Sequence, residues 1–276
     1  MAASLPTDCS ITKRVTKFPQ PRGGYLNPKD FDAEQIDDAL VLYKQENLHP
    51  SLVGLAVNYL TRVMTGTPVQ QAFAVSLEGA TIFDKTYPDT SLFKTKSAVK
   101  YAKKMMSEIK TLDRQAIINA CKLAGYDVCA RASINGYKPI ETINPNDETI
   151  RNIELMVKRA KEHLRMNGHI VDAAFDFTGG YTPIISSGTG DFLTHDTLWT
   201  IKVSKNEPNS RHTLELLVEY IMGTQANYQK FSTVRQLGIY NPRLNKSYTI
   251  KLANIPDETF KTVGMDVIGY HKIDMI

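Results

Sequence analysis

The sequence predicts an α+β protein in which a mostly helical N-terminal half precedes an α-β-β-β-α-β core with a mixed central sheet. Apolar residues recur every three or four positions through the first half, which is the spacing of an amphipathic helix. After about residue 168 the spacing changes to two, which is typical of strands. A further helical pattern begins near Arg211 and separates two groups of predicted strands. These changes of period give the fold class.

Length and composition are those of an ordinary globular chain. The 276 residues allow one large domain or two modest ones, and 42% hydrophobic with 22% charged residues is typical of soluble proteins. The cysteines Cys9, Cys121 and Cys129 are too few for a disulfide framework and lack zinc-ligand spacing. The N-terminus does not resemble a signal peptide, and no apolar run approaches the length of a membrane span. We therefore expect a cytoplasmic protein with no membrane partner.

Three segments are predicted along the chain. Residues 1–27 are polar and rich in proline and glycine, so we expect an extended arm with little structure of its own. Residues 28–133 carry successive helical patterns and are expected to form a mostly helical subdomain. The composition changes over residues 133–146, and a second subdomain is predicted over residues 146–276.

Each helix is predicted from an apolar face and from the residues that start or end it. The expected helices and apolar segments of the first half are Pro28–Gln45, Pro50–Met64, Val69–Ala80, a basic helix around residues 96–109, and Asp113–Gly125. Those of the second half are Asp147–Met166, Arg211–Met222 and Pro256–Val263. The helix over Asp147–Met166 has the clearest pattern, and Asn167-Gly168 is expected to end it.

The strands are predicted from alternating apolar residues bounded by turn residues. They are His169–Phe177, Tyr181–Ser186, Asp191–Thr194, Leu198–Ser204, Val234–Tyr240 and Ser247–Leu252. The third and fourth are expected to form a hairpin around His195-Asp196.

Positive charge is concentrated in one predicted helix. Six lysines and a single acid lie between residues 94 and 110, whereas the net charge of the whole chain is +4. Four of these lysines share one helix face, namely Lys96, Lys100, Lys103 and Lys104. The commoner role of such a face is to be solvated. If a nucleic-acid site exists elsewhere in the chain, this face would lie along the phosphate backbone.

A lysine in an otherwise apolar strand requires an anionic partner. Lys202 stands at such a position, and burying an unpaired ammonium group costs several kcal/mol. Asp191 is the nearest candidate, although it could instead cap the turn that follows Gly188–Gly190, and Lys202 could extend to solvent at the sheet edge. Trp199 alternates with Thr200 and is therefore expected in the core on the opposite face of the sheet.

Asp191 on one predicted strand and Thr200-x-Lys202 on the next resemble the motif of the PD-(D/E)xK phosphodiesterase superfamily, the fold of many restriction enzymes and recombination exonucleases. In that family an Asp on the second strand, and an Asp or Glu two residues before a Lys on the third, bind a divalent metal. The Lys helps to orient or activate the attacking water. The resemblance covers residues 146–252 and implies a restriction-endonuclease-like core with catalytic roles for Asp191 and Lys202. It does not extend to residues 1–133.

The chain departs from this family at Thr200, where the second acid is expected. A neutral hydroxyl is a poor ligand for Mg²⁺. In some members of the superfamily the second carboxylate lies on the following helix, and Glu215, in the helix after Lys202, has about this spacing. The resemblance therefore implies a Mg²⁺ or Mn²⁺ site held by Asp191 and Glu215, with the Ile201 carbonyl as a further ligand. Taken alone, Glu215 is also an ordinary first-turn acid of a helix.

Two functions follow from this resemblance. The first is metal-dependent hydrolysis of DNA by a nuclease of prophage or defence type, in which Arg243 would grip a phosphate, although a structural salt bridge explains Arg243 at least as well. The second is an inactive protein of the same fold that binds DNA or a protein partner, because the acid is lost at Thr200. A partner or a second copy would bind through the N-terminal helical half. The Gln-x-x-x-Tyr signature of the exonucleases is altered to Glu215 and Glu219, which argues against an exonuclease.

Overall fold

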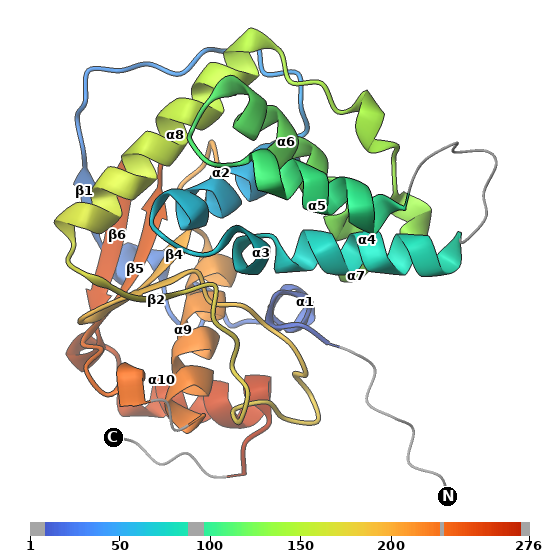
Figure 1. Ribbon diagram of the computed structural model, residues 1–276. Helices are drawn as coiled ribbons and strands as arrows, with labels where there is room; N and C mark the ends of the chain where they lie inside the picture. The colour runs from blue at the N-terminus through green and yellow to red at the C-terminus, as the bar shows by residue number, and fades with distance from the viewer. Residues whose placement is uncertain (1–8, 88–96, 227–228, 272–276) are drawn as a thin grey trace, which may run out of the picture. The chain divides into compact units, whose positions relative to one another are not determined.

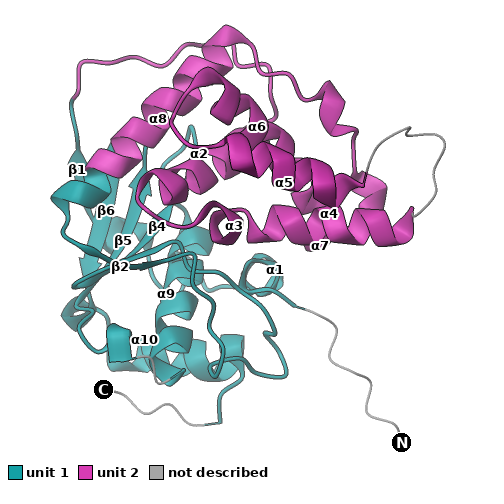
Figure 2. Cartoon of the chain, in the orientation of Figure 1, with its two compact units in different colours: residues 1–37, 163–276 teal, residues 38–162 magenta. Residues whose placement is uncertain are grey.

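The computed structural model describes residues 9–87, 97–226 and 229–271, and it divides into two compact units (Figure 2). Unit 1 comprises residues 1–37 and 163–276, and unit 2 comprises residues 38–162. The observed division therefore differs from the predicted segments. The N-terminal residues group with the C-terminal part of the chain, and the long helix that begins at Asp147 contributes to both units.

Unit 1 is built on one mixed sheet (Figure 1). The strands formed by its described residues are β1 (Asp32–Gln35), β2 (Ile170–Ala173), β3 (Phe192–Thr194), β4 (Thr197–Ile201), β5 (Gln236–Asn241) and β6 (Lys246–Lys251). Their order across the sheet is β1-β6-β5-β4-β3-β2, and among them only β4 and β5 pair in parallel. A parallel pair needs a crossover connection, which α9 (Ser210–Gln225) supplies. The predicted α+β class with a mixed sheet is confirmed.

Helix α9 covers one face of this sheet. Asn209 starts the helix through a capping box with His212. The buried apolar side of α9 packs in one core with Leu198 of β4 and Ile239 of β5. The remaining helical segments of unit 1 are α1 (Ile11–Lys17), η1 (Pro28–Asp30), η4 (Gln229–Phe231), η5 (Leu252–Asn254), α10 (Asp257–Thr262) and the π-helix η6 (Val263–Ile268).

Trp199 lies on the other face of the sheet, as predicted. It is 1% exposed and meets the edge of the His163 ring, with 4.5 Å between the ring centroids. His163 also stacks on Tyr240 at 4.0 Å, and burial lowers the pKa of His163 to about 4. Gly238 pairs with Trp199 across β4 and β5, and a Cβ at this position would collide with the indole ring. The absence of a side chain at Gly238 therefore makes room for the tryptophan.

Unit 2 is helical over its described residues. Its helical segments are α2 (Pro50–Met64), α3 (Val69–Ala72), α4 (Ala74–Thr86), α5 (Ala98–Glu108), α6 (Arg114–Ala124), α7 (Asp127–Arg131), η2 (Ile134–Gly136), η3 (Ile140–Thr142) and the first part of α8 (Asp147–Met166). The helices predicted over Pro50–Met64 and Asp147–Met166 are confirmed at both ends. The segment predicted over Val69–Ala80 is two helices that meet at Phe73. Within the described ranges, no helix is both long and apolar enough to cross a bilayer.

A buried carboxylate joins three helices of unit 2. Asp127 in α7 accepts hydrogen bonds from the Ser76 hydroxyl in α4 at 2.6 Å, from the Tyr59 hydroxyl in α2 and from Nε of Arg131 at 3.2 Å. Burial raises the pKa of Asp127, although Arg131 and both hydroxyls oppose this shift. These hydrogen bonds hold α2, α4 and α7 together at a point where Asp127 itself is 2% exposed.

Two predictions for the N-terminal residues are wrong. The arm predicted over residues 1–27 contains α1, whose Ile11 and Val15 are buried in the core of unit 1. The segment Pro28–Gln45 contains no α-helix, since it forms η1, the edge strand β1 and an irregular stretch. Hydrogen bonding of β1 to β6 outweighs the local helical preference of these residues.

Two strand predictions after residue 168 also need correction. Strand β2 ends at Ala173, because Ala174 has a left-handed backbone with φ of 55° and cannot continue the strand. The segment Tyr181–Ser186 forms no strand and is closed as a turn by a hydrogen bond between its own residues. The hairpin around His195-Asp196 is confirmed as β3 and β4.

Candidate functional site

Two of the predicted site residues, Asp191 and Lys202, lie with Thr200 on the face of the sheet that α9 covers. Leu198 packs in the core with α9, so alternation along β4 places Thr200 on the same face. Lys202 directly follows β4 and continues this alternation. Asp191 precedes β3, and its hydrogen bonds to β4 place it beside Thr200. The structure therefore brings Asp191, Thr200 and Lys202 together at the C-terminal end of β4.

The direct partner of Lys202 is Glu215. Its Nζ lies 2.5 Å from Oε2 of Glu215 on α9, and the two side chains are 25% and 11% exposed. Burial alone would lower the pKa of Lys202, but the carboxylates of Glu215, Glu219 and Asp191 raise it above the ordinary value. Burial would likewise raise the pKa of Glu215, but Lys202 and the Thr12 hydroxyl hold it below the ordinary value. Both partners are therefore charged at neutral pH.

Asp191 is fixed by donors from β4. Its Oδ2 accepts the Ile201 backbone N–H at 2.9 Å and the Thr200 hydroxyl at 3.1 Å, and the residue is 9% exposed. The Thr200 side chain thus donates to Asp191. These hydrogen bonds orient the carboxylate of Asp191.

Thr12 and Glu219 also lie close to Lys202 and Glu215, although neither residue was predicted to belong to the site. The Thr12 hydroxyl on α1 donates to Oε1 of Glu215 at 2.6 Å. Glu219 follows Glu215 by one turn of α9, is 5% exposed, and acts on the pKa of Lys202. The i, i+4 spacing of Glu215 and Glu219 predicts that the two side chains lie on the same face of α9, so the sequence could have indicated Glu219 as a site residue. No sequence signal connects Thr12 with Glu215, because 203 positions separate them.

We call Asp191, Lys202, Glu215, Glu219 and Thr12 the Lys202 cluster. Three carboxyl groups in it act on the charge of one ammonium group. Carboxylate oxygens are the ligands that Mg²⁺ and Mn²⁺ prefer, and one or two of them with water suffice for Mg²⁺. In donor type and charge, Asp191 and Glu215 therefore fit such an ion. No group of three or more His, Cys, Asp or Glu side chains arranged to hold a metal is found among the described residues.

Replacing Thr12 with valine is expected to raise the pKa of Glu215 toward its ordinary value, because one of the two donors to this carboxylate is lost. Carboxyl ¹³C NMR titration measures this shift, with Glu215→Gln used to assign the resonance. Thr12→Ser should keep the wild-type pKa. Thr16→Val makes the same change one turn along α1 and should also leave it unchanged. An unaltered titration in Thr12→Val would contradict the assigned contact.

No family model, curated protein or solved structure matches this chain. The functional interpretation therefore depends on the contacts within the Lys202 cluster and on the motif of Asp191 and Lys202.

The predicted phosphate-binding lysines lie in unit 2. Lys100, Lys103 and Lys104 are exposed on α5, whose opposite side buries Ala102 and Met106. The predicted solvated face is therefore present for these lysines. The predictions for Lys96 and for the neighbouring Lys94 lie outside the described residues.

Arg243 lies in the turn between β5 and β6. Its backbone N–H donates to Oδ1 of Asn241 at 3.1 Å, and Nδ2 of Asn241 donates to the Ser204 carbonyl at 2.9 Å. Ser204 belongs to the loop that follows Lys202. The structure therefore ties the Arg243 turn to the segment that leaves the Lys202 cluster, and Arg243 itself is half-buried.

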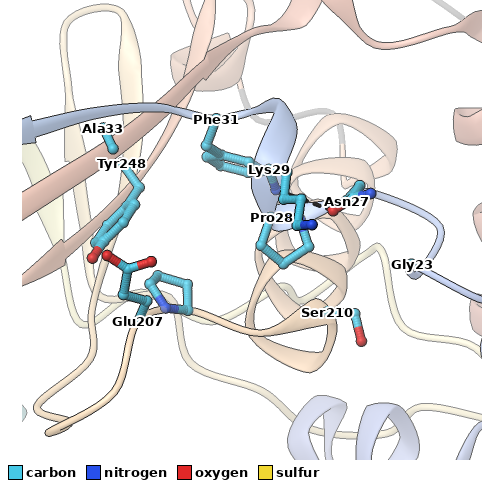
Figure 3. A pocket seen from close by; sticks show the side chains of 10 residues that line it. Gly23, Asn27, Pro28, Lys29, Phe31, Ala33, Glu207, Ser210 and Tyr248 are labelled. Atoms are coloured by element: carbon cyan, nitrogen blue, oxygen red, sulfur yellow. Dashed lines mark hydrogen bonds between the residues drawn. The ribbon is translucent and has the colours of Figure 1, made fainter.

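A pocket of about 590 Å³ opens on the same face of the sheet (Figure 3). Phe31 and Tyr248 form part of its wall, and Glu207 points toward the Tyr248 hydroxyl in the close view. Thr200 pairs with Ile239, which pairs with Tyr248, so Tyr248 is two strands from Thr200, about 10 Å. The pocket is therefore a neighbour of the Lys202 cluster, whose residues do not line it.

Proposed function

We propose that this protein is a metal-dependent nuclease that hydrolyses DNA phosphodiester bonds. The observation that carries the proposal is the pairing of Lys202, at the end of β4, with Glu215 on α9 beside Asp191. A lysine held among carboxylates at a strand end can both neutralise charge and orient water. The position of Glu215, on the helix that follows Lys202, supports its assignment as a migrated second acid of the PD-(D/E)xK pattern.

The order and pairing of the elements support a restriction-endonuclease-like core. The elements α8, β2, β3, β4, α9 and β5 follow one another as α-β-β-β-α-β. Their strands pair antiparallel from β2 to β4 and then in parallel between β4 and β5. Asp191 directly precedes the second strand of this series and Lys202 directly follows the third, which supports the comparison with the motif.

The proposed mechanism assigns separate tasks to the side chains of the cluster. A bound Mg²⁺ or Mn²⁺ ion would act as a Lewis acid on the scissile phosphate and lower the pKa of a coordinated water. Asp191 and Glu215 would hold this ion. Lys202 would donate a hydrogen bond that positions the attacking water, and its charge would stabilise the negative charge that develops on the phosphate oxygens. Thr200 and the Ile201 N–H would keep the carboxylate of Asp191 oriented.

A plasmid assay tests this function. The wild-type protein is expected to nick or linearise supercoiled plasmid with Mg²⁺ or Mn²⁺, and EDTA should stop the reaction. Lys202→Ala should reduce the rate at least about 100-fold, because loss of one preorganised charge-stabilising group typically costs this much. Lys251→Ala, at an exposed position of unit 1, is the matched control and should cleave normally. If the wild-type protein does not cleave plasmid with either metal, the protein is not a nuclease.

The second candidate function is an inactive protein of the same fold that binds DNA or a protein. The observation that favours it is Thr200, whose hydroxyl donates to Asp191 where the family has a second acid on this strand. Under this alternative the wild-type protein and Lys202→Ala would be equally inactive in the plasmid assay, while the wild-type protein would still bind DNA or its protein partner.

A further inference from the structure

Helix α1 is a fixed part of unit 1. Ile11 and Val15 are buried in its core, and the Ile11 N–H donates to the Ser187 carbonyl at 2.9 Å. The guanidinium of Arg14 donates to the backbone carbonyls of Asp266 and Val267, each at 2.8 Å. The position of α1 is therefore set from both sides. Its outward side chains are held at defined places on the surface of unit 1.

The outward side of α1 carries two Thr-Lys pairs one helical turn apart. Thr12, Lys13, Thr16 and Lys17 are exposed, and the helix contains no acidic residue. Lys13 and Lys17 are about 6 Å apart along the helix axis, which is about two steps of the roughly 3.4 Å axial spacing of phosphates on one DNA strand. This side of α1 carries positive charge, which attracts a phosphodiester backbone.

Thr12 connects this surface to the Lys202 cluster. Its hydroxyl bonds to Glu215, so α1 contacts the cluster through Thr12, and Lys13 follows Thr12 in the chain. A cationic surface next to the cluster attracts the negatively charged DNA backbone and guides the strand toward the cluster.

We propose that the outward side of α1 receives the phosphodiester backbone of the DNA substrate next to the cleavage site, with Lys13 and Lys17 as the phosphate contacts. This inference rests on the proposed function, because it identifies the wall along which the substrate of the same site lies. It also gives a role to the N-terminal residues, where the sequence analysis expected an extended arm.

Fluorescence anisotropy with a short labelled DNA duplex, with Ca²⁺ in place of Mg²⁺ and Mn²⁺, tests the proposal without a requirement for cleavage. The variant Lys13→Gln/Lys17→Gln should bind about 10-fold or more weakly and should reduce the slope of log affinity against log salt by about 1.8, since each phosphate contact contributes about 0.9. The matched control is Lys251→Gln/Lys261→Gln, which removes the same charge from exposed positions of unit 1. Its salt slope should equal that of the wild-type protein.

The outcomes separate this inference from the nuclease itself. A wild-type protein that binds DNA with the predicted lysine dependence but does not cleave plasmid supports the α1 contact and removes the enzyme. The α1 contact alone is overturned if the wild-type protein cleaves plasmid but Lys13→Gln/Lys17→Gln keeps its affinity for DNA. The same conclusion follows if this variant and the control variant lose affinity equally. A wild-type protein that does not bind the duplex overturns both.

Discussion

Replacing Lys202 with methionine is expected to lower the free energy of unfolding of unit 1 by about 3 kcal/mol, because breaking a largely buried ion pair leaves carboxylates without their cation. Lys202 interacts with Glu215, Glu219 and Asp191, so all three carboxylates lose their nearest ammonium group. Trp199, the single tryptophan of the chain, lies in unit 1 on β4. Urea denaturation followed by its fluorescence therefore reports on this unit.

The partner variant Glu215→Gln is expected to cost less, about 1 kcal/mol, because the charge of Lys202 then still faces Glu219 and Asp191. The double variant should be more stable than the sum of the single changes implies, since the two sites are in contact. Lys246→Met, which removes one partner of the more exposed Lys246–Glu207 pair, should leave unit 1 nearly unchanged. A larger loss in Glu215→Gln than in Lys202→Met would contradict the picture of one lysine serving three carboxylates.

The stability difference between wild type and Lys202→Met should depend on pH in a defined direction. The pKa of Glu215 is held below its ordinary value of 4.5 by Lys202 and Thr12 despite burial, so the stabilisation that this group contributes is fully present above about pH 4.5 and is lost as pH falls through the folded-state pKa. The pKa of Lys202 is raised above the ordinary lysine value of 10.5. The stabilisation that Lys202 contributes is therefore fully present at every pH below 10.5. The difference should therefore be constant near pH 7 and shrink in acid.

The sequence predicts those parts of this site that depend on local periodicity. A lysine in an apolar strand implies an anionic partner, and alternation along β4 correctly separates Trp199 from Thr200 and Lys202. The partner in direct contact, Glu215, is on the next helix, and Asp191 bonds to the backbone of β4 instead. Which carboxylate meets the ammonium group depends on how α9 packs on the sheet, and periodicity does not contain that information.

Contacts between distant segments explain the remaining differences. β1 is an edge strand because it pairs with β6, more than 200 positions away, although its residues fit a helical pattern. Proline and glycine near α1 predict an extended arm. The helix forms nevertheless, because Ile11 and Val15 are buried in a core that includes residues near the C-terminus. Both cases show tertiary burial outweighing local preference.

Asp127→Asn is expected to destabilise unit 2 by about 3 kcal/mol, because the buried carboxylate accepts hydrogen bonds from three donors, including a guanidinium group. The amide of asparagine offers one oxygen in place of two. Its NH₂ group must therefore face at least one of the donors Ser76, Tyr59 and Arg131, and a buried donor is left unsatisfied. Hydrogen exchange measured by mass spectrometry should show faster exchange in α2, α4 and α7.

The same measurement contains its own controls. Exchange in β4 and β5 should be unchanged in Asp127→Asn, because all of the groups that bond to Asp127 belong to unit 2. Tyr59→Phe removes one of the three donors and leaves the carboxylate bonded to Ser76 and Arg131, so a loss of about 1 kcal/mol is expected. If Tyr59→Phe and Asp127→Asn accelerate exchange equally, the carboxylate is not the centre of this network, and the packing of Tyr59 against Phe73 holds α2 in place instead.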